Sequence, residues 1–190
     1  MQIGVLALQG DFAQHKKMLK SLDVDVKLIR YPDDLKNCQG LIIPGGESTT
    51  IFQQMEFIGL DKSIIEFAKT KPVFGTCAGM ILISNFVDDK QNNTLRLIDI
   101  SVSRNAWGRQ VFSFTQNISL NFDDSEEHKA FFIRAPRVTQ ISNNIKILAQ
   151  INKEPVLLTD GKHLVCSFHP ELGADNRIHK YFLRMVNDRI

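Results

Sequence analysis

The sequence predicts a three-layer α/β/α fold, in which helices cover both faces of a mostly parallel sheet that carries a small antiparallel extension. In the first half, short runs rich in β-branched residues alternate with helical patterns and are joined by short turns, which is typical of a parallel sheet. The 190 residues, 43% apolar and 23% charged, have the size and composition of one globular domain. We therefore expect residues 1–190 to form a single domain.

Each element of the first half follows from its periodicity. Short apolar, β-branched runs predict buried strands, and apolar residues repeated on one side predict helices. The expected strands cover residues 3–8, 24–29, 40–43 and 72–74, and the expected helices cover residues 12–22 and a stretch whose apolar face carries Leu60, Ile64, Phe67 and Ala68.

The pattern changes between residue 94 and about residue 150. Strand-like pieces at 97–102, 111–114 and 131–133 predict an antiparallel insertion or sheet extension. A polar turn is expected at 123–125, and the charged run 123–129 predicts a mobile surface loop. The last segment predicts an amphipathic helix whose apolar residues recur at helical spacing; they are Ile178, Tyr181, Phe182, Met185 and Val186.

Charge and cysteine content exclude several classes of protein. The net charge of +2 gives no general field for attracting nucleic acid or an anionic membrane surface. The longest nearly apolar run, 72–83, is too short to span a bilayer, and residues 1–8 resemble a first strand rather than a signal peptide. Cys38, Cys77 and Cys166 cannot all pair and have no C-x-x-C spacing. We expect reduced thiols, a cytoplasmic protein and no metal.

The run Gly75-Thr76-Cys77-Ala78-Gly79 follows a short apolar strand and precedes an apolar helical run. This is the context of a nucleophile elbow with Cys in place of Ser. The flanking glycines avoid clashes in a strained turn, and the start of the helix offers backbone N–H groups to an oxyanion. A buried cysteine in an ordinary β-turn-α connection would give the same pattern.

A second candidate group follows the strand expected at residues 164–168. In an extended segment, His169 and Glu171 project to the same side, with Pro170 fixing the backbone between them. They could therefore form a base and its orienting carboxylate. By the same alternation, Cys166 faces the core. A histidine at a strand end also fits a polar residue at the rim of the sheet.

Residues 41–50 predict a third strand-to-helix turn. Gly45 and Gly46 let a ligand approach the backbone, and Ser48 or Thr49 can cap the helix that follows. The Walker lysine is missing and no G-x-G-x-x-G follows a strand, so no nucleotide cofactor is expected. A structural tight turn is the alternative. All three turns follow strands of one parallel sheet, where such folds bind ligands, and this shared position favours a functional site.

Six ordered motifs, at residues 5–10, 44–50, 74–79, 104–110, 132–136 and 166–171, resemble the class I glutamine amidotransferase family and, within it, the glutaminase subunits of pyridoxal 5′-phosphate synthase. The resemblance covers essentially the whole chain and implies the three-layer fold of that family. One departure is Trp107, where Phe is expected.

This resemblance implies hydrolysis of L-glutamine to glutamate and ammonia by a Cys-His-Glu triad. Cys77 would attack the side-chain amide, His169 would transfer protons and Glu171 would orient His169. Gly46 and Ala78 are the implied oxyanion donors. No cofactor is implied, and the glutamine site would be lined by Gly46, Glu47, Ser48, Arg104, Ile133 and Arg134.

The resemblance also implies a partner, a synthase subunit with a β/α barrel that receives the ammonia in a hetero-oligomer with this chain. The loop of Gln9 and Gly10 is the expected point of communication. Two alternatives are open. The glutaminase subunit for imidazole glycerol phosphate synthesis lacks the run from Gly46 to Thr49 in its oxyanion turn. A thiol-based stress sensor would leave His169 and its neighbouring glutamate without a purpose.

Overall fold

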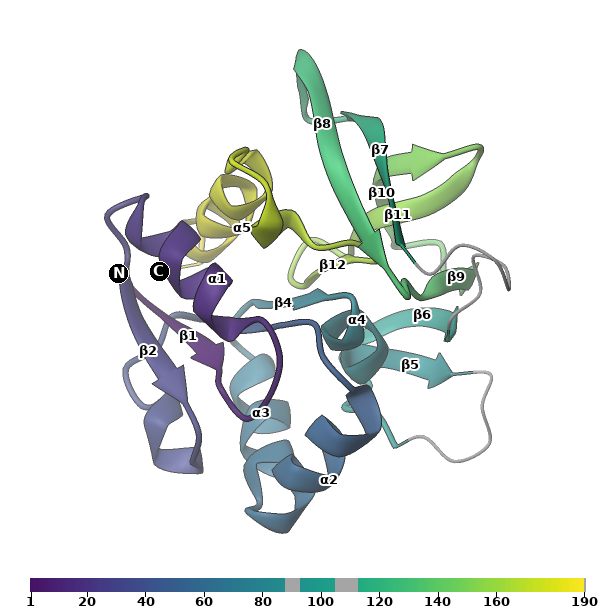
Figure 1. Cartoon of the computed structure of the whole chain (residues 1–190). Coiled ribbons are helices and arrows are strands. Elements are labelled where there is room, and N and C mark those ends of the chain that lie inside the picture. The colour runs from purple at the N-terminus through teal and green to yellow at the C-terminus, as the bar shows by residue number, and fades with distance from the viewer. Residues whose placement is uncertain (88–92, 105–112, 190) are drawn as a thin grey trace.

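The computed structural model describes residues 1–87, 93–104 and 113–189, and its centre is a seven-stranded sheet (Figure 1). The strand order is β10-β11-β12-β4-β3-β1-β2. Strands from β12 to β2 run parallel, and β10 and β11 add an antiparallel edge, as predicted. The strands are β1 (Gln2–Leu6), β2 (Asp25–Ile29), β3 (Gly40–Ile43), β4 (Val73–Thr76), β10 (Lys146–Ile151), β11 (Glu154–Thr159) and β12 (Leu164–Cys166).

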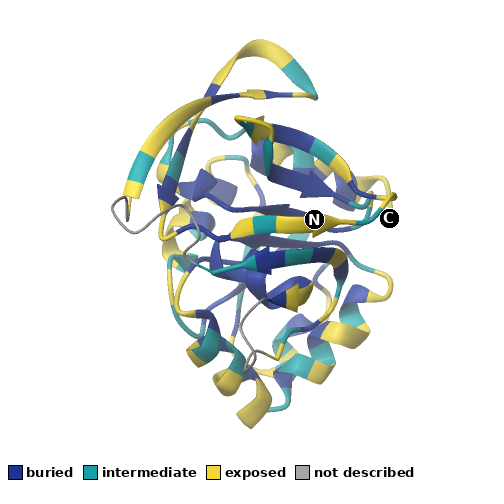
Figure 2. Cartoon of the chain, turned by 90° about the vertical axis from the view of Figure 1, so that its right-hand side faces the viewer, coloured by how far each residue is buried: buried dark blue, intermediate teal, exposed yellow. Residues whose placement is uncertain are grey.

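Helices cover both faces of this sheet (Figure 1). They are α1 (Phe12–Lys20), α2 (Ser48–Phe57), α3 (Leu60–Ala68), α4 (Ala78–Ile83) and α5 (Arg177–Asn187). Strand alternation divides the core in two: on β3, Leu41 and Ile43 pack with α2, α3 and α4, and Ile42 packs with α1 and α5. The central strands are accordingly buried, while exposed residues lie on the outer helices and a projecting hairpin (Figure 2).

The second half adds two small sheets and confirms the predicted antiparallel insertion. One sheet is mixed, with β6 antiparallel to β9 and parallel to β5, and the other is the antiparallel hairpin of β7 and β8. Trp107 and residues 111–112 of the expected strand 111–114 lie outside the described residues. The strands are β5 (Ser84–Val87), β6 (Ile98–Ser103), β7 (Ser113–Leu120), β8 (Asp123–Ile133) and β9 (Arg137–Ile141).

The charged run 123–129 forms the first half of β8, so the prediction of a turn and a mobile loop there is wrong. The turn lies just before it, at residues 121–122. In the exposed half, Asp123 pairs with Leu120 of β7 and His128 with Ile118, with an irregularity in the register between these pairs. From His128 onward alternate residues, including Ala130 and Phe132, are buried. The structure of this run depends on strand pairing, which its amino-acid composition cannot predict.

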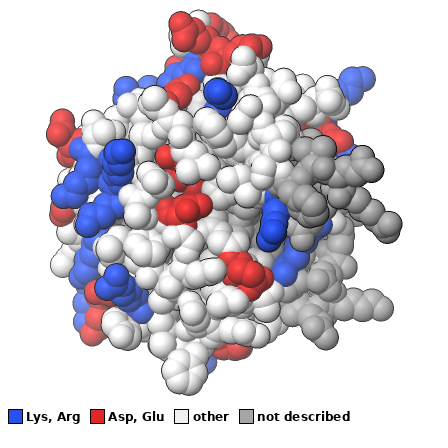
Figure 3. Space-filling view, in the orientation of Figure 1, with Lys and Arg blue, Asp and Glu red and all other residues white. Residues whose placement is uncertain are grey.

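The predicted amphipathic helix at the end of the chain is α5, which buries Ile178, Phe182 and Val186. Within the described ranges, no helix is both long and apolar enough to cross a membrane. Both basic and acidic side chains lie on the face shown in Figure 3.

Candidate active site

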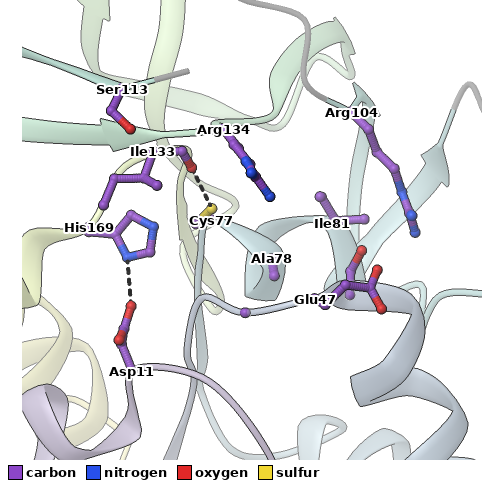
Figure 4. A pocket seen from close by; sticks show the side chains of 12 residues that line it. Asp11, Glu47, Cys77, Ala78, Ile81, Arg104, Ser113, Ile133, Arg134 and His169 are labelled. Carbon is purple, nitrogen blue, oxygen red and sulfur yellow. Dashed lines mark hydrogen bonds and ion pairs between the residues drawn. The ribbon is translucent and has the colours of Figure 1, made fainter.

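A cavity of about 550 Å³ opens where β3, β4 and β12 end. Its walls come from the turns that follow these three strands, which are the turns singled out from the sequence, and from the ends of β6, β7 and β8 (Figure 4). Parallel sheets bind ligands at this edge. The lining residues are Asp11, Gly46, Glu47, Ser48, Cys77, Ala78, Ile81, Arg104, Ser113, Ile133, Arg134 and His169.

Cys77 occupies the sharp turn between β4 and α4, with φ 49° and ψ −105°. A residue with a side chain is strained in such a conformation, by about 1–3 kcal/mol. Close approaches explain the two flanking glycines: a Cβ on Gly75 would lie 2.5 Å from the carbonyl oxygen of Gly79, and one on Gly79 would lie 1.9 Å from that of Ile43. The Cys77 thiol donates to the carbonyl oxygen of Ile133 at 3.6 Å. The predicted elbow is therefore present.

His169 and Glu171 are in contact and buried, with Nδ1 of His169 2.8 Å from Oε1 of Glu171. Their local conformation differs from the extended segment expected, because Pro170–Leu172 form a 3-10 turn. Pro170 fits the first position of this turn because its φ is already fixed and its missing N–H needs no partner. The predicted contact is thus made by a turn instead of by strand alternation.

The charges of this pair support each other. Burial disfavours the imidazolium of His169, but hydrogen bonds to Cys77 and Glu171 outweigh burial and raise the pKa of His169 to about 10. Burial also acts against the carboxylate of Glu171, whereas the adjacent His15 and His169 lower its pKa below the usual value. His169 is therefore a cation at neutral pH, held between the sulfur of Cys77 and the carboxylate of Glu171.

The glycine turn after β3 lies directly against His169. A Cβ on Gly45 would lie 2.4 Å from Cε1 of His169, and a Cβ on Gly10 would lie 1.8 Å from the carbonyl oxygen of Gly45. The side-chain oxygen of Gln9 accepts a hydrogen bond from the backbone N–H of Glu47 at 3.0 Å. The loop of Gln9 and Gly10 therefore touches the turn expected to hold the oxyanion.

Glu47 is the N-cap of α2, so the prediction that Ser48 or Thr49 caps this helix is wrong by one or two residues. Its carboxylate accepts from the backbone N–H groups of Thr49 at 3.1 Å and Thr50 at 2.6 Å. These are donors that a helix leaves without partners at its first turn. Ser48 is buried and lines the cavity.

The two small sheets bring Arg104, Ile133 and Arg134 to the same cavity (Figure 4). Arg104 follows β6, and its Nη1 donates to Oγ1 of Thr49 at 3.0 Å. Arg134 follows β8 with a φ of 45°, a left-handed conformation that is uncommon for a residue with a side chain. The cavity thus combines every residue expected in the glutamine site with the elbow.

Asp11 also lines the cavity, although no motif singled it out. Its Oδ2 lies 3.6 Å from Nδ1 of His169 (Figure 4). In the described part of the chain, Asp11, His169 and Glu171 are a group that could hold a metal ion, with ligand atoms within 4.8 Å of one another. A cation there would compete with the N–H of His169 for both carboxylates.

A buried polar cluster behind Glu171 was also missed. Nε2 of His15 lies 3.3 Å from Oε2 of Glu171 and 3.2 Å from Oγ1 of Thr76, and Nδ1 of His15 lies 3.0 Å from Nε2 of His179. Burial lowers the pKa of both histidines, that of His179 to about 3. A signal existed, because each histidine lies on the buried face of an amphipathic helix, where a polar group needs a partner.

Comparison with known proteins agrees with this geometry. The model of the SNO glutamine amidotransferase family matches residues 5–188. Pyridoxal 5′-phosphate synthase subunit PdxT of Thermosipho africanus is 49% identical over 187 residues, which cover 98% of this chain and 99% of that protein. The protein of the same name from Francisella philomiragia is 45% identical over 185 residues, which cover 97% and 99%.

Solved structures give the same result. A crystal structure described as a glutamine amidotransferase has a TM-score of 0.93 and 38% identity, covering 97% of this chain and 98% of that one. PurLQS from Thermotoga maritima, at a TM-score of 0.72 and 14% identity over 98% and 97% of the two chains, shares the fold. The predicted class I glutamine amidotransferase fold is confirmed. With matches of this extent in both sequence and structure, the chain belongs to the SNO glutamine amidotransferase family.

Proposed function

We propose that this protein hydrolyses L-glutamine to L-glutamate and ammonia and supplies the ammonia to a synthase subunit for pyridoxal 5′-phosphate synthesis. The observation that carries the proposal is that Cys77 and His169 line one cavity at the end of the parallel strands, with Glu171 bonded to His169 behind it. The family is one of glutamine amidotransferases, and the relatives at 49% and 45% identity are named as subunits of pyridoxal 5′-phosphate synthase.

Cys77 is the proposed nucleophile because it is the cysteine that lines the cavity. Cys166 is buried, with its Sγ 3.2 Å from the carbonyl oxygen of Phe168, and burial raises its pKa well above the usual value. Burial likewise raises the pKa of Cys38. Both are therefore held as thiols, and the thiolate is the reactive form.

The reaction has two halves. The Cys77 thiolate attacks the amide carbon of glutamine, and the N–H groups of Gly46 and Ala78 stabilise the resulting oxyanion. His169, which holds its proton at neutral pH, donates it to the departing nitrogen, so ammonia leaves and a γ-glutamyl thioester remains. His169 then takes a proton from water, hydroxide attacks the thioester, and glutamate leaves as the thiolate re-forms. Glu171 keeps the ring of His169 oriented in both halves.

The rest of the cavity suits the α-amino-acid end of glutamine. A guanidinium binds a carboxylate through two parallel hydrogen bonds, and we assign this role to Arg104 and Arg134. Glu47 lies below Arg104 in Figure 4, and with Ser48 it offers oxygen atoms to the ammonium group. Gly46 and the side chain of Ile133 complete the proposed glutamine site.

The proposal includes activation by the synthase subunit, a β/α barrel that forms a hetero-oligomer with this chain. Ammonia released into water would be protonated and lost as a nucleophile, so hydrolysis is useful only when the partner is docked. Gln9 and Gly10 contact the turn that carries Gly46. A partner bound at this loop could reorient the peptide between Gly45 and Gly46, because glycines have little barrier to such a flip.

We place the activity in the cytoplasm, since the Cys77 nucleophile must stay reduced, and we assign it to one domain, residues 1–190. Glutaminase assays at saturating glutamine, with and without the synthase subunit, test the proposal. We expect a low kcat for the isolated chain and a higher kcat in the complex. Gln9→Ala should reduce this rise in kcat more than it reduces the affinity for the synthase subunit. Equal kcat in both states would refute activation by docking, and a complex that forms no glutamate would refute the glutaminase function itself.

A further inference from the structure

A line of four buried side chains runs from the cavity into the interior: His169, Glu171, His15 and His179. Oε1 of Glu171 contacts His169, and Oε2 lies against Nε2 of His15. Among the described residues, none forms a hydrogen bond to this Oε2: Nε2 of His15 lies 3.3 Å away, but its hydrogen-bond partner is Oγ1 of Thr76. A buried oxygen without a donor is costly, by about 1–3 kcal/mol. The ring of His15 is therefore the group available to stabilise it.

The contacts determine which ring nitrogens carry hydrogen. His15 and His179 both have lowered pKa values because they are buried, so each neutral ring has one N–H. In the described structure, Nδ1 of His179 has no partner, whereas its Nε2 lies 3.0 Å from Nδ1 of His15. The N–H of His179 therefore donates to His15, whose own N–H is at Nε2, facing Glu171 and Thr76. The opposite tautomers would bury an unpaired N–H and set a lone pair against the carboxylate.

We propose that His15 is a positioning residue for the glutaminase reaction, whose Nε2–H, bonded to Thr76, also attracts the nearby Oε2 of Glu171 and thereby keeps Oε1 on Nδ1 of His169. This inference rests on the proposed function of the site. His15 is itself held by His179 on α5 and by Thr76 at the end of β4. Three elements distant in sequence thus orient one carboxylate, which extends the expected triad by a fourth side chain.

A shift in pH dependence distinguishes positioning from a general structural role. Without the N–H of His15, the carboxylate of Glu171 is less stabilised, so its pKa rises and the acid limb of the kcat/KM profile moves to higher pH. The titratable groups around Glu171 are His15 from α1, His179 from α5, His169 from its own turn, Cys77 from the elbow, Cys166 from β12 and Asp11 from the loop before α1.

Variants at His15 test the proposal in complex with the synthase subunit. His15→Phe removes both nitrogens at similar volume, and His15→Asn places its amide near Nδ1 and cannot reach Glu171. We expect each to lower kcat about 10- to 100-fold, as loss of an outer-shell partner does, with KM for glutamine little changed and the acid limb moved to higher pH. His15→Gln, whose amide nitrogen replaces Nε2, should recover most of the loss. His163→Gln, at a buried histidine outside the cavity, should keep the wild-type kcat.

A double variant isolates the route of the effect. If His15 acts through Glu171, adding His15→Phe to Glu171→Gln lowers kcat no further. Additive losses would overturn the proposal. So would a wild-type kcat in a folded His15→Phe or His15→Asn protein, with folding checked by the melting temperature.

Alkylation of Cys77 by iodoacetamide requires neither glutamine nor the synthase subunit. Once Glu171 is free to rotate, the imidazolium of His169 loses its counter-ion, so we expect His15→Phe to slow the reaction several-fold, with mass spectrometry locating the adduct. If the wild-type complex forms no glutamate while His15→Phe slows alkylation, the proposed function fails and the positioning role stands. An unchanged alkylation rate in a folded His15→Phe protein would overturn the positioning role.

Discussion

The central sheet with its helices, here called the parallel half, and the two small sheets of β5 to β9, called the antiparallel half because most of their pairs are antiparallel, build the same cavity in different ways. The parallel half presents Cys77, His169 and Glu171 from buried turns, whereas the antiparallel half presents Arg104 and Arg134 from strand ends that are partly or largely exposed. Bond-making groups tolerate little positional error, which suits buried turns. Groups that bind and release a substrate suit an accessible rim. The comparison therefore predicts that chemistry resides in one half and glutamine affinity in the other.

The largest expected effect comes from the elbow. Cys77→Ala and Cys77→Ser should abolish glutamine hydrolysis, with a loss of about 10⁴-fold or more in kcat, because the thioester can no longer form. Cys38→Ser, at a buried cysteine outside the cavity, is the matched control and should leave kcat nearly intact. A glutamine-like electrophile should label Cys77 in mass spectrometry. Labelling of Cys38 or Cys166 in its place would contradict the assignment.

The next effect concerns the carboxylate behind the imidazole. Glu171→Gln should lower kcat about 10²- to 10⁴-fold and change KM for glutamine little, because the lost interaction stabilises the imidazolium during proton transfer and does not touch glutamine. Steady-state kinetics of the complex measure both constants. A wild-type kcat in this variant would reduce the triad to Cys77 and His169.

Smaller effects are expected in the antiparallel half. Arg134→Ala and Arg104→Ala should raise KM about 10- to 100-fold with less effect on kcat, since a hydrogen bond to a charged group contributes about 1.5–3 kcal/mol. Arg137→Ala is the matched control, because Arg137 lies three residues after Arg134 but forms an ion pair with Glu154 outside the cavity. If these two substitutions lowered kcat at constant KM, the assignment of chemistry to one half and glutamine affinity to the other would be wrong.

The halves also differ in how far their structure follows from the sequence. The strands and glycine turns of the parallel half can be predicted from local sequence. Gly75 and Gly79, for example, stand where any such elbow brings backbone atoms close together. In the antiparallel half, the charged composition of residues 123–129 predicts a loop, whereas both ends of the run pair with β7 in a strand. The contact between His15 and His179, separated by 164 residues, depends on how α1 and α5 pack, so no local pattern could reveal it.

Two buried histidines extend the comparison to stability. Nδ1 of His163, just before β12, accepts a hydrogen bond from the backbone N–H of Val73 in β4 at 3.2 Å, and burial lowers the pKa of His163 to about 4. Burial also lowers the pKa of His128 in β8, but Asp175, 2.9 Å from its Nδ1, opposes that shift. Protonation of His163 breaks a contact between the strands that deliver Cys77 and His169, whereas protonation of His128 strengthens its pair.

Acid should therefore weaken the parallel half first, and this is the smallest effect expected. The unfolded state binds a proton at His163 near pH 6.5, and the folded state binds it only near pH 4. The stability that is present above pH 6.5 is therefore lost as the pH falls to about 4. This group contributes at most about 1.4 kcal/mol of unfolding free energy per pH unit. His163→Gln should flatten the pH dependence of the unfolding free energy measured with urea, although His15 and His179 contribute in the same direction. His128→Gln, the matched control, should change the slope less. If His128→Gln flattened the dependence and His163→Gln did not, the hairpin would be the acid-sensitive half and the comparison would be reversed.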